Sequence, residues 1–117
     1  MYKKKFYFIV FEGIEGTGKS FQIKKLSHNL KKRGLPVVTT REPGGSKTAD
    51  LIRNLIFSKK SNNFDALTDY FLFLASRNEH VKKTITKAKK DRKILICDRF
   101  IDSTYAYQIK GNNINAQ

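Results

Sequence analysis

The sequence GIEGTGKS, from Gly13 to Ser20, matches the pattern G-x-x-x-x-G-K-[ST]. It follows an apolar run, Phe6–Phe11, and opens an amphipathic stretch, Lys19–Arg33, so a strand is expected to lead into it and a helix to follow it. Glycines let the backbone turn its N–H groups toward a concavity, and the start of a helix adds partial positive charge. The motif therefore predicts a loop that holds the phosphates of a nucleoside triphosphate; the alternative is a tight strand-to-helix turn. Its residues are Gly13, Ile14, Glu15, Gly16, Thr17, Gly18, Lys19 and Ser20.

The end of this motif and a distant aspartate are candidates for phosphate and metal contacts. We expect Lys19 to place its ammonium group against the β- and γ-phosphates and Ser20 to supply an oxygen ligand to Mg²⁺. Asp98 ends the apolar run Ile94–Asp98, and the carboxyl ends of parallel strands meet at one edge of a sheet. Asp98 is therefore the candidate carboxylate for the metal, with a capping role as the alternative.

Short apolar runs alternate with longer helical stretches along the chain. Strands are expected at Phe6–Phe11, Val37–Thr40 and Ile94–Asp98. Helices are expected at Lys19–Arg33, from about Thr48 to Phe57, from Asp65 to about Lys90, and from near Asp102. This order is typical of an α/β fold with a parallel sheet and right-handed crossovers.

Two of these helices carry apolar residues near helical spacing, which predicts an apolar stripe along each. In the first helix the stripe consists of Phe21, Ile23, Leu26 and Leu30. In the second it consists of Leu51, Ile52, Leu55 and Ile56.

The composition limits the classes of partner and compartment. The chain has 117 residues, which suits one domain, and 24 Lys and Arg against 10 Asp and Glu give a charge of +14. Anionic partners are therefore expected, and a basic module that binds polyanions such as single-stranded nucleic acid is the alternative to an enzyme. The single cysteine, Cys97, excludes an internal disulfide and suits the cytoplasm. No apolar run approaches the roughly 20 residues that span a bilayer, and Phe6–Phe11 is too short for a signal-peptide core.

Three further segments accompany the loop, namely Thr40–Gly45 (TREPGG), Leu72–Arg77 (LFLASR) and Asp98–Gln108 (DRFIDSTYAYQ). In this order and at this spacing, the four segments closely resemble the thymidylate kinases of bacterial type, which are P-loop nucleoside monophosphate kinases. The resemblance spans Phe6 to Gln108. It implies an α/β P-loop NTPase fold with three layers and a parallel sheet. It also implies transfer of the γ-phosphoryl group of Mg²⁺-bound ATP to thymidine monophosphate, with another nucleoside monophosphate as the alternative acceptor.

The same resemblance implies roles for particular residues. Glu15 matches the acid near the sugar 3′-hydroxyl and the acceptor phosphate, and Arg99 matches the arginine that grips this phosphate beside Asp98. Phe73 resembles the aromatic residue that stacks on thymine, and Arg77, one helical turn later, the arginine that reads the base edge. The implied catalytic residues are thus Lys19, Glu15, Arg99 and Asp98. The other implied acceptor-site residues are Glu42, Pro43, Arg53, Ser103, Thr104 and Gln108. Phe73 as a core residue and Arg53 as a solvated helix residue are the alternatives.

Residues 1–117 are expected to form the N-terminal part of a single kinase domain, with the first three of the family's five strands. In the family a flexible lid, further helices and two more strands follow. The strand Phe6–Phe11 would then be an exposed apolar edge, and the helix Asp65–Lys90 corresponds to the one that pairs with its mate in the family's homodimer. We therefore expect self-association, weak nucleotide binding and slow turnover. The sequence departs from the family at Phe100, which is usually tyrosine, and at Ile109-Lys110, which precede the expected glycine.

Overall fold

Three parallel strands form one sheet in the computed structural model, which describes residues 5–13, 16–58 and 63–100. The strands are β1 (Tyr7–Phe11), β2 (Val37–Arg41) and β3 (Ile94–Asp98), in the spatial order β1–β3–β2. Asp98 lies opposite Phe11 of β1 and Arg41 of β2, so the carboxyl ends of the strands share one edge. The predicted parallel sheet is confirmed, and β1 lies at its edge among the described strands.

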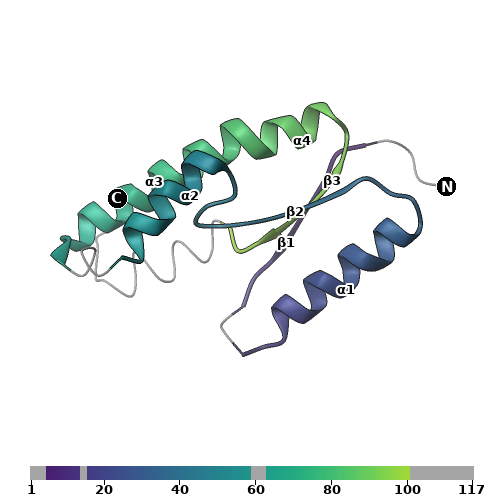
Figure 1. Ribbon diagram of the computed structural model, residues 1–117, viewed down its shortest axis with the longest axis horizontal. Helices are drawn as coiled ribbons and strands as arrows, with labels where there is room; N and C mark the ends of the chain where they lie inside the picture. Colours follow the sequence, from purple (N-terminus) through teal and green to yellow (C-terminus); the bar gives the residue numbers. More distant parts are fainter. Residues whose placement is uncertain (1–4, 14–15, 59–62, 101–117) are drawn as a thin grey trace.

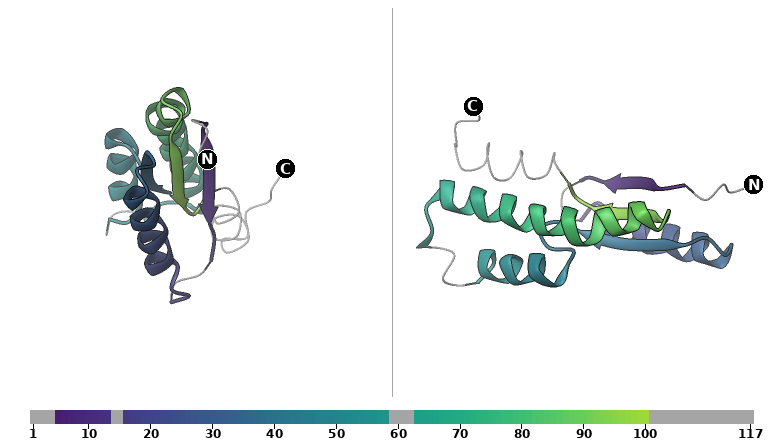
Figure 2. Two further views of the ribbon diagram at one scale, coloured as in Figure 1. Left: turned by 90° about the vertical axis from the view of Figure 1, so that its right-hand side faces the viewer. Right: turned by 90° about the horizontal axis from the view of Figure 1, so that it is seen from above.

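Helices cover both faces of this sheet, which gives the three layers expected from the sequence. Helix α1 (Lys19–Lys32) lies on one side, and the helices that follow β2 lie on the other (Figures 1 and 2). The latter are α2 (Lys47–Ile56), α3 (Ala66–His80), the π-helical segment η2 (Val81–Ile85) and α4 (Thr86–Lys90). The helix expected near Asp102 lies outside the described residues.

The core is centred on β3, as its uninterrupted apolar sequence predicts. Ile94, Leu95, Ile96 and Cys97 are all buried. Ile94 and Ile96 pack with Ile23 of α1, and half-buried side chains from α1 and the neighbouring strands surround this group. Because β3 is covered on both faces, the residues at its carboxyl end have a firmly fixed position.

Three residues of the predicted apolar stripes are exposed. Phe21 on α1 is 66% exposed, and Leu51 and Leu55 on α2 are 64% and 41% exposed. Helix α2 buries a narrower face, which includes Ala49 and Ile56, because it packs closely on α3 where Ala49 meets Ser76. The apolar spacing alone could not show how narrow the contact between these two helices is.

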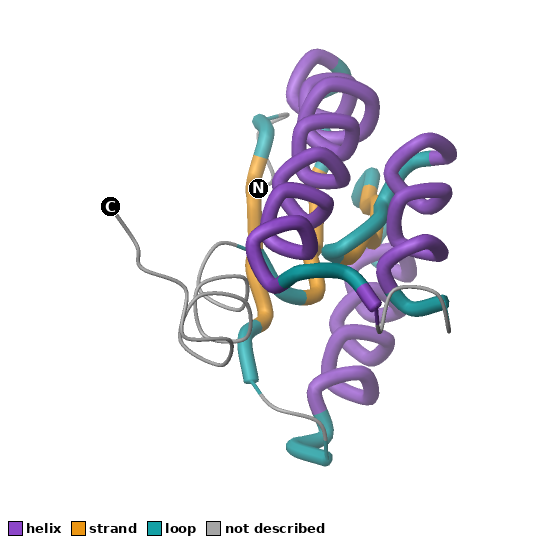
Figure 3. Tube along the Cα trace, turned by 90° about the vertical axis from the view of Figure 1, so that its left-hand side faces the viewer, coloured by secondary structure: helices purple, strands orange, loops and turns teal. Residues whose placement is uncertain are grey.

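The helix expected from Asp65 to Lys90 is confirmed in extent but not in regularity. Figure 3 shows α3, η2 and α4 as one long helical run beside the strands. The π-helical turn at Val81–Ile85 interrupts its α-helical geometry, and π-helical turns often occur at functional sites. This segment lies beside the turn that follows β2, since Thr84 donates a hydrogen bond from its hydroxyl to the Gly45 carbonyl at 2.5 Å.

Candidate active site

The predicted phosphate-binding loop connects β1 with α1. Gly18 precedes the helix with φ 79° and ψ 11°, a left-handed conformation that glycine adopts without steric cost. It makes no side-chain cap, so the first N–H groups of α1 are not covered by a capping side chain from this position. A glycine at this position lets an anion approach the backbone at the start of the helix. Ile14 and Glu15, which belong to the predicted motif, lie outside the described residues.

Charged side chains from distant parts of the sequence meet beside this loop. Lys19 Nζ lies 2.6 Å from Asp98 Oδ1, and the Lys19 side chain is only 8% exposed. Arg99 Nε lies 4.0 Å from the same carboxylate oxygen. The backbone supports this arrangement, because Arg99 donates its N–H to the Phe11 carbonyl at 2.9 Å and Phe100 donates its N–H to Glu12 Oε1 at 2.6 Å. The structure thus brings together Lys19, Asp98 and Arg99, as the sequence predicts.

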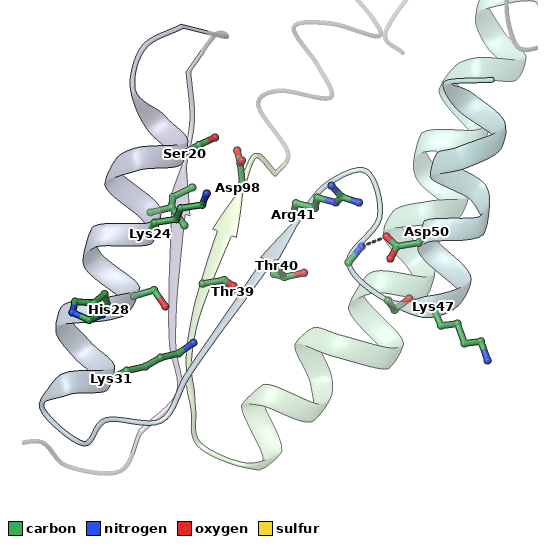
Figure 4. Close-up of a pocket in the computed structure, with 14 residues that line it drawn as sticks. Ser20, Lys24, His28, Lys31, Thr39, Thr40, Arg41, Lys47, Asp50 and Asp98 are labelled. Atoms are coloured by element: carbon green, nitrogen blue, oxygen red, sulfur yellow. Dashed lines mark hydrogen bonds between the residues drawn. The ribbon is translucent and has the colours of Figure 1, made fainter. Parts of the chain in front are cut away.

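A pocket of about 800 Å³ extends from this point between α1 and β2. Ser20 and Asp98 lie at one end, and Lys24 and Lys31 extend from α1 along its length (Figure 4). Arg41 and Lys47 add two further cations to its lining. The pocket is therefore suited to an anionic ligand that reaches the phosphate loop.

A second group of contacts surrounds the turn that follows β2. Glu42 is buried, and its two carboxylate oxygens bind different partners. Glu42 Oε1 accepts hydrogen bonds from Arg77 Nε at 2.7 Å and pairs with Arg77 Nη2 at 2.6 Å. Glu42 Oε2 lies 2.7 Å from His80 Nδ1. The side chain of Glu42 is thus directed into the protein, toward α3, and not into solvent.

The backbone of the same turn is held by helices α2 and α3. Gly44 donates its N–H to Ser76 Oγ at 2.9 Å, and the Ser76 hydroxyl donates to the Ala49 carbonyl at 3.1 Å. Gly45 donates its N–H to Asp50 Oδ1 at 3.0 Å. Arg53 Nη1 donates to the carbonyl of Pro43, which follows a cis peptide bond, at 2.7 Å. These contacts fix the path of the chain from Pro43 to Gly45.

The residues predicted to bind the acceptor base lie on α2 and α3 beside this turn. Phe73 is half-buried, and its ring packs edge to face on Phe57 with 6.3 Å between centroids. The Arg53 guanidinium lies 5.0 Å from the Phe57 ring, and the Arg77 guanidinium 4.6 Å from the Phe100 ring. Burial, and next the charge of Arg41, lower the pKa of Arg53 from its usual value. Arg53 is therefore not simply a solvated helix residue, and Phe73 is not wholly in the core.

Three predicted acceptor-site residues, Ser103, Thr104 and Gln108, lie outside the described residues. Three polar residues on the helical run contact the turn although no sequence motif predicted this, namely Ser76, His80 and Thr84. A signal was present, because these three follow one another at intervals of four and so share one helix face. A polar row on a helix face that packs inward indicates buried hydrogen bonds.

Cys97 is buried beside the charged group. Its thiol donates to the Arg99 carbonyl at 3.0 Å. Burial, reinforced by Glu42 and Asp98, raises the pKa of this thiol well above its usual value. Cys97 therefore stays protonated and supports the backbone at Arg99 instead of acting as a nucleophile.

Ser20 and Asp98 are the residues that could hold a magnesium ion. Their hydroxyl and carboxylate oxygens lie at the same end of the pocket in Figure 4, and such oxygens are the ligands that Mg²⁺ prefers. Within residues 5–13, 16–58 and 63–100, the structure contains no cluster of three His, Cys, Asp or Glu that could bind a metal ion by itself. This donor set fits a metal that also binds the phosphates of a ligand.

Residues 5–13, 16–58 and 63–100 contain no helix with the length and apolar character to cross a membrane.

Comparison with known proteins gives consistent matches to one family. The family model described as thymidylate kinase matches residues 11–117. The thymidylate kinase of Acholeplasma laidlawii is 46% identical over 110 residues, which are 94% of this chain and 54% of that protein. The thymidylate kinase of Dehalococcoides mccartyi is 49% identical over 108 residues, with coverages of 92% and 52%. The crystal structure of thymidylate kinase from Ehrlichia chaffeensis superposes with a TM-score of 0.84 at 44% identity and covers 95% of this chain and 62% of that one. The chain thus spans about half the length of the curated relatives that it matches.

Proposed function

The chain belongs to the thymidylate kinase family, and on this premise we propose that it transfers the γ-phosphoryl group of ATP to thymidine monophosphate. The product is thymidine diphosphate, for the synthesis of thymidine triphosphate. The observation that supports this best is the meeting of Lys19, Asp98 and Arg99 at the end of the phosphate loop. Such a group can position two phosphates and neutralise their charge, which is most of what phosphoryl transfer requires.

Each of these residues has a proposed role. Lys19 binds the β- and γ-phosphates of ATP, and its ammonium group lies beside Asp98 in this structure. Ser20 and Asp98 hold Mg²⁺, which bridges phosphate oxygens and neutralises their charge when it is bound. Arg99 grips the phosphate of thymidine monophosphate, and Glu15 acts near the sugar 3′-hydroxyl and this phosphate.

The acceptor nucleoside is proposed to bind beside the turn after β2. Phe73 stacks on thymine and Arg77 reads the base edge, while Glu42, Pro43 and Arg53 shape the site. In support, Phe73 and Arg77 both lie half-buried on α3, and Arg53 and Arg77 contact Pro43 and Glu42 directly. Ser103, Thr104 and Gln108 are proposed to complete the base pocket.

Thermal protection by nucleoside monophosphates tests the proposal. A ligand that binds only the folded chain raises its melting temperature in proportion to the logarithm of ligand concentration over Kd. Thymidine monophosphate should raise the melting temperature more than guanosine or uridine monophosphate at equal concentration. Protection by guanosine or uridine monophosphate alone would show that the proposed substrate is wrong, while the family and the fold would stand.

The basic pocket supports a second candidate, the binding of a polyanion. Lys24, Lys31, Arg41 and Lys47 all line it, and single-stranded nucleic acid binds to such positively charged grooves. Competition separates the two candidates. A short oligonucleotide that displaces thymidine monophosphate poorly, together with ATP-dependent turnover, would exclude this second function.

We also propose that the chain pairs with a second copy through the helical run predicted at Asp65–Lys90. Leu67, Phe71 and Leu74 of α3 are exposed, and their spacing places them on one face of the helix. Burial of such a face in a homodimer would remove its apolar surface from water. The buried free thiol of Cys97 is compatible with a reducing compartment, and we propose the cytoplasm. Sedimentation of the chain at several concentrations tests the dimer.

A further inference from the structure

A histidine that no sequence motif singled out lies at the centre of the contacts around the β2–α2 turn. His80 ends α3 and is fully buried. Its Nδ1 lies 2.7 Å from Glu42 Oε2, and its Nε2 lies 2.7 Å from Thr40 Oγ1. Because an ionised carboxylate only accepts hydrogen bonds, Nδ1 must carry the proton in this pair. In the tautomer with this proton on Nδ1, Nε2 accepts a hydrogen bond from the Thr40 hydroxyl.

Glu42 connects this histidine to Arg77. Its other oxygen, Oε1, accepts a hydrogen bond from Arg77 Nε at 2.7 Å and forms an ion pair with Arg77 Nη2 at 2.6 Å. When two N–H groups of one guanidinium contact the same oxygen, they restrict the orientation of the guanidinium plane as well as its position. The same guanidinium lies 4.6 Å from the Phe100 ring. The orientation of Arg77 therefore depends on Glu42, and the orientation of Glu42 depends on His80.

We propose that His80 is a positioning residue, which sets base selectivity by holding Glu42 and, through it, Arg77. This inference rests on the proposed function, because Arg77 is the residue proposed to read the base edge. Thymine presents a carbonyl oxygen at the position where cytosine presents an amino group, so a fixed arginine donor favours thymine. A loose arginine would bind both bases with similar affinity.

The chemistry of the site explains why histidine fits here. An apolar residue would leave a carboxylate oxygen of Glu42 buried without this partner, which is costly. A lysine or arginine at position 80 would have to fit in the narrow space beside Gly45. This space is narrow because a Cβ atom added to Gly45 would lie only 2.3 Å from His80 Cδ2. Imidazole supplies one donor to Glu42 within a flat ring that the turn can accommodate.

Two substitutions separate the contacts of His80. In His80→Asn the side-chain amide lies near the position of Nδ1 and can still donate to Glu42. In His80→Gln the amide lies near the position of Nε2 and reaches Thr40 instead. The measured quantity is the ratio of the Kd for deoxycytidine monophosphate to the Kd for thymidine monophosphate, by calorimetric titration of the 117-residue chain. His80→Gln should lower this ratio about tenfold, whereas His80→Asn should change it less than threefold.

Thr84→Val is the matched structural control. Thr84 binds the same turn through the Gly45 carbonyl but does not contact Glu42 in any described hydrogen bond. It should lower the melting temperature and leave the selectivity ratio unchanged. A His80→Gln variant that behaves in the same way has only a structural role, and the proposal would be overturned.

Two further measurements keep the proposal testable. In an Arg77→Ala background, His80→Gln should cause no additional change in the ratio, because its effect passes through Arg77. If His80→Gln does not fold, Glu42→Gln provides the test, since its amide cannot accept from both Arg77 and His80, and the ratio should again fall about tenfold. An unchanged ratio in folded Glu42→Gln contradicts the proposal. If the unaltered chain binds no thymidine monophosphate, the proposed function itself fails, and this inference fails with it.

Discussion

The loop after β1 and the turn after β2 lie at the same edge of the sheet, but they are stabilised in different ways. An added Cβ at Gly45 would lie 2.6 Å from Thr40 Oγ1 and still closer to His80, so the turn is enclosed by packed side chains. An added Cβ at Gly18 in the loop would meet nothing within 4 Å. The turn is thus shaped by packed side chains, while the loop leaves open space at Gly18. This difference indicates that packed side chains fix the conformation of the turn after β2, whereas the backbone at Gly18 has room beside it for further contacts.

Replacing Gly45 and Gly18 by alanine should give the largest difference in stability between the turn and the loop. Gly45→Ala should lower the free energy of unfolding by about 3 kcal/mol, because overpacking adds to the strain of its φ of 103°. Gly18→Ala has a similar φ, 79°, but open space, so about 1 kcal/mol is expected. Urea unfolding followed by circular dichroism measures both. Equal losses would mean that the turn is not held more tightly than the loop.

Replacing one serine beside the turn and one serine after the loop compares how far each region depends on hydrogen bonds. Ser76→Ala removes the buried acceptor of the Gly44 N–H, and we expect a loss of about 1–3 kcal/mol in the free energy of unfolding. Ser20→Ala, at an exposed position after the loop, should change stability by less than about 0.5 kcal/mol while it weakens binding of Mg²⁺-ATP. Chemical denaturation gives the first quantity and ATP titration the second. A stable Ser76→Ala variant would show that the turn does not depend on this hydroxyl.

Lys19 should affect ligand binding more than folding. Lys19→Met removes the ammonium group that contacts Asp98 here and the phosphates in the proposed complex, so the affinity for ATP should fall tenfold or more. Lys25→Met, an exposed substitution on the same helix, is the control and should bind ATP normally. Fluorescence titration with a labelled ATP analogue measures both. Unchanged affinity in folded Lys19→Met would mean that the loop is only a strand-to-helix turn.

The sequence predicted one of these two regions better than the other. The loop could be identified because its function depends on backbone conformation, which the glycines and the following Lys19 and Ser20 encode locally. Strand β3 could be placed because Ile94–Cys97 are all apolar, as residues of a strand covered on both faces must be. The contacts of the turn could not be derived, because they join residues such as Glu42 and His80 that are 38 positions apart. Exposure of Leu51 and Leu55 also depends on how closely α2 approaches α3, which the apolar spacing does not specify.

Arg99 provides the most sensitive test of this comparison, because it combines features of the turn after β2 and of the loop after β1. Its backbone is held by hydrogen bonds to Phe11 and Cys97, as in the turn, but its φ of 69° is one that glycine adopts more easily, as in the loop. Arg99→Ala and Arg99→Gly should weaken binding of thymidine monophosphate equally, since both remove the guanidinium. The glycine variant should nevertheless be more stable than the alanine variant by about 1 kcal/mol, because alanine keeps the steric cost of the left-handed conformation.

Arg92, with a φ of 55° in the turn before β3, is the matched control for this last experiment. The same pair of substitutions there should give a similar stability difference with no effect on nucleotide binding. Thermal unfolding with and without thymidine monophosphate separates the two effects at both positions. If the alanine and glycine variants of Arg99 are equally stable while those of Arg92 differ, the backbone at Arg99 is not strained. Arg99 would then be held in place by its surroundings, as the turn is, at no conformational cost.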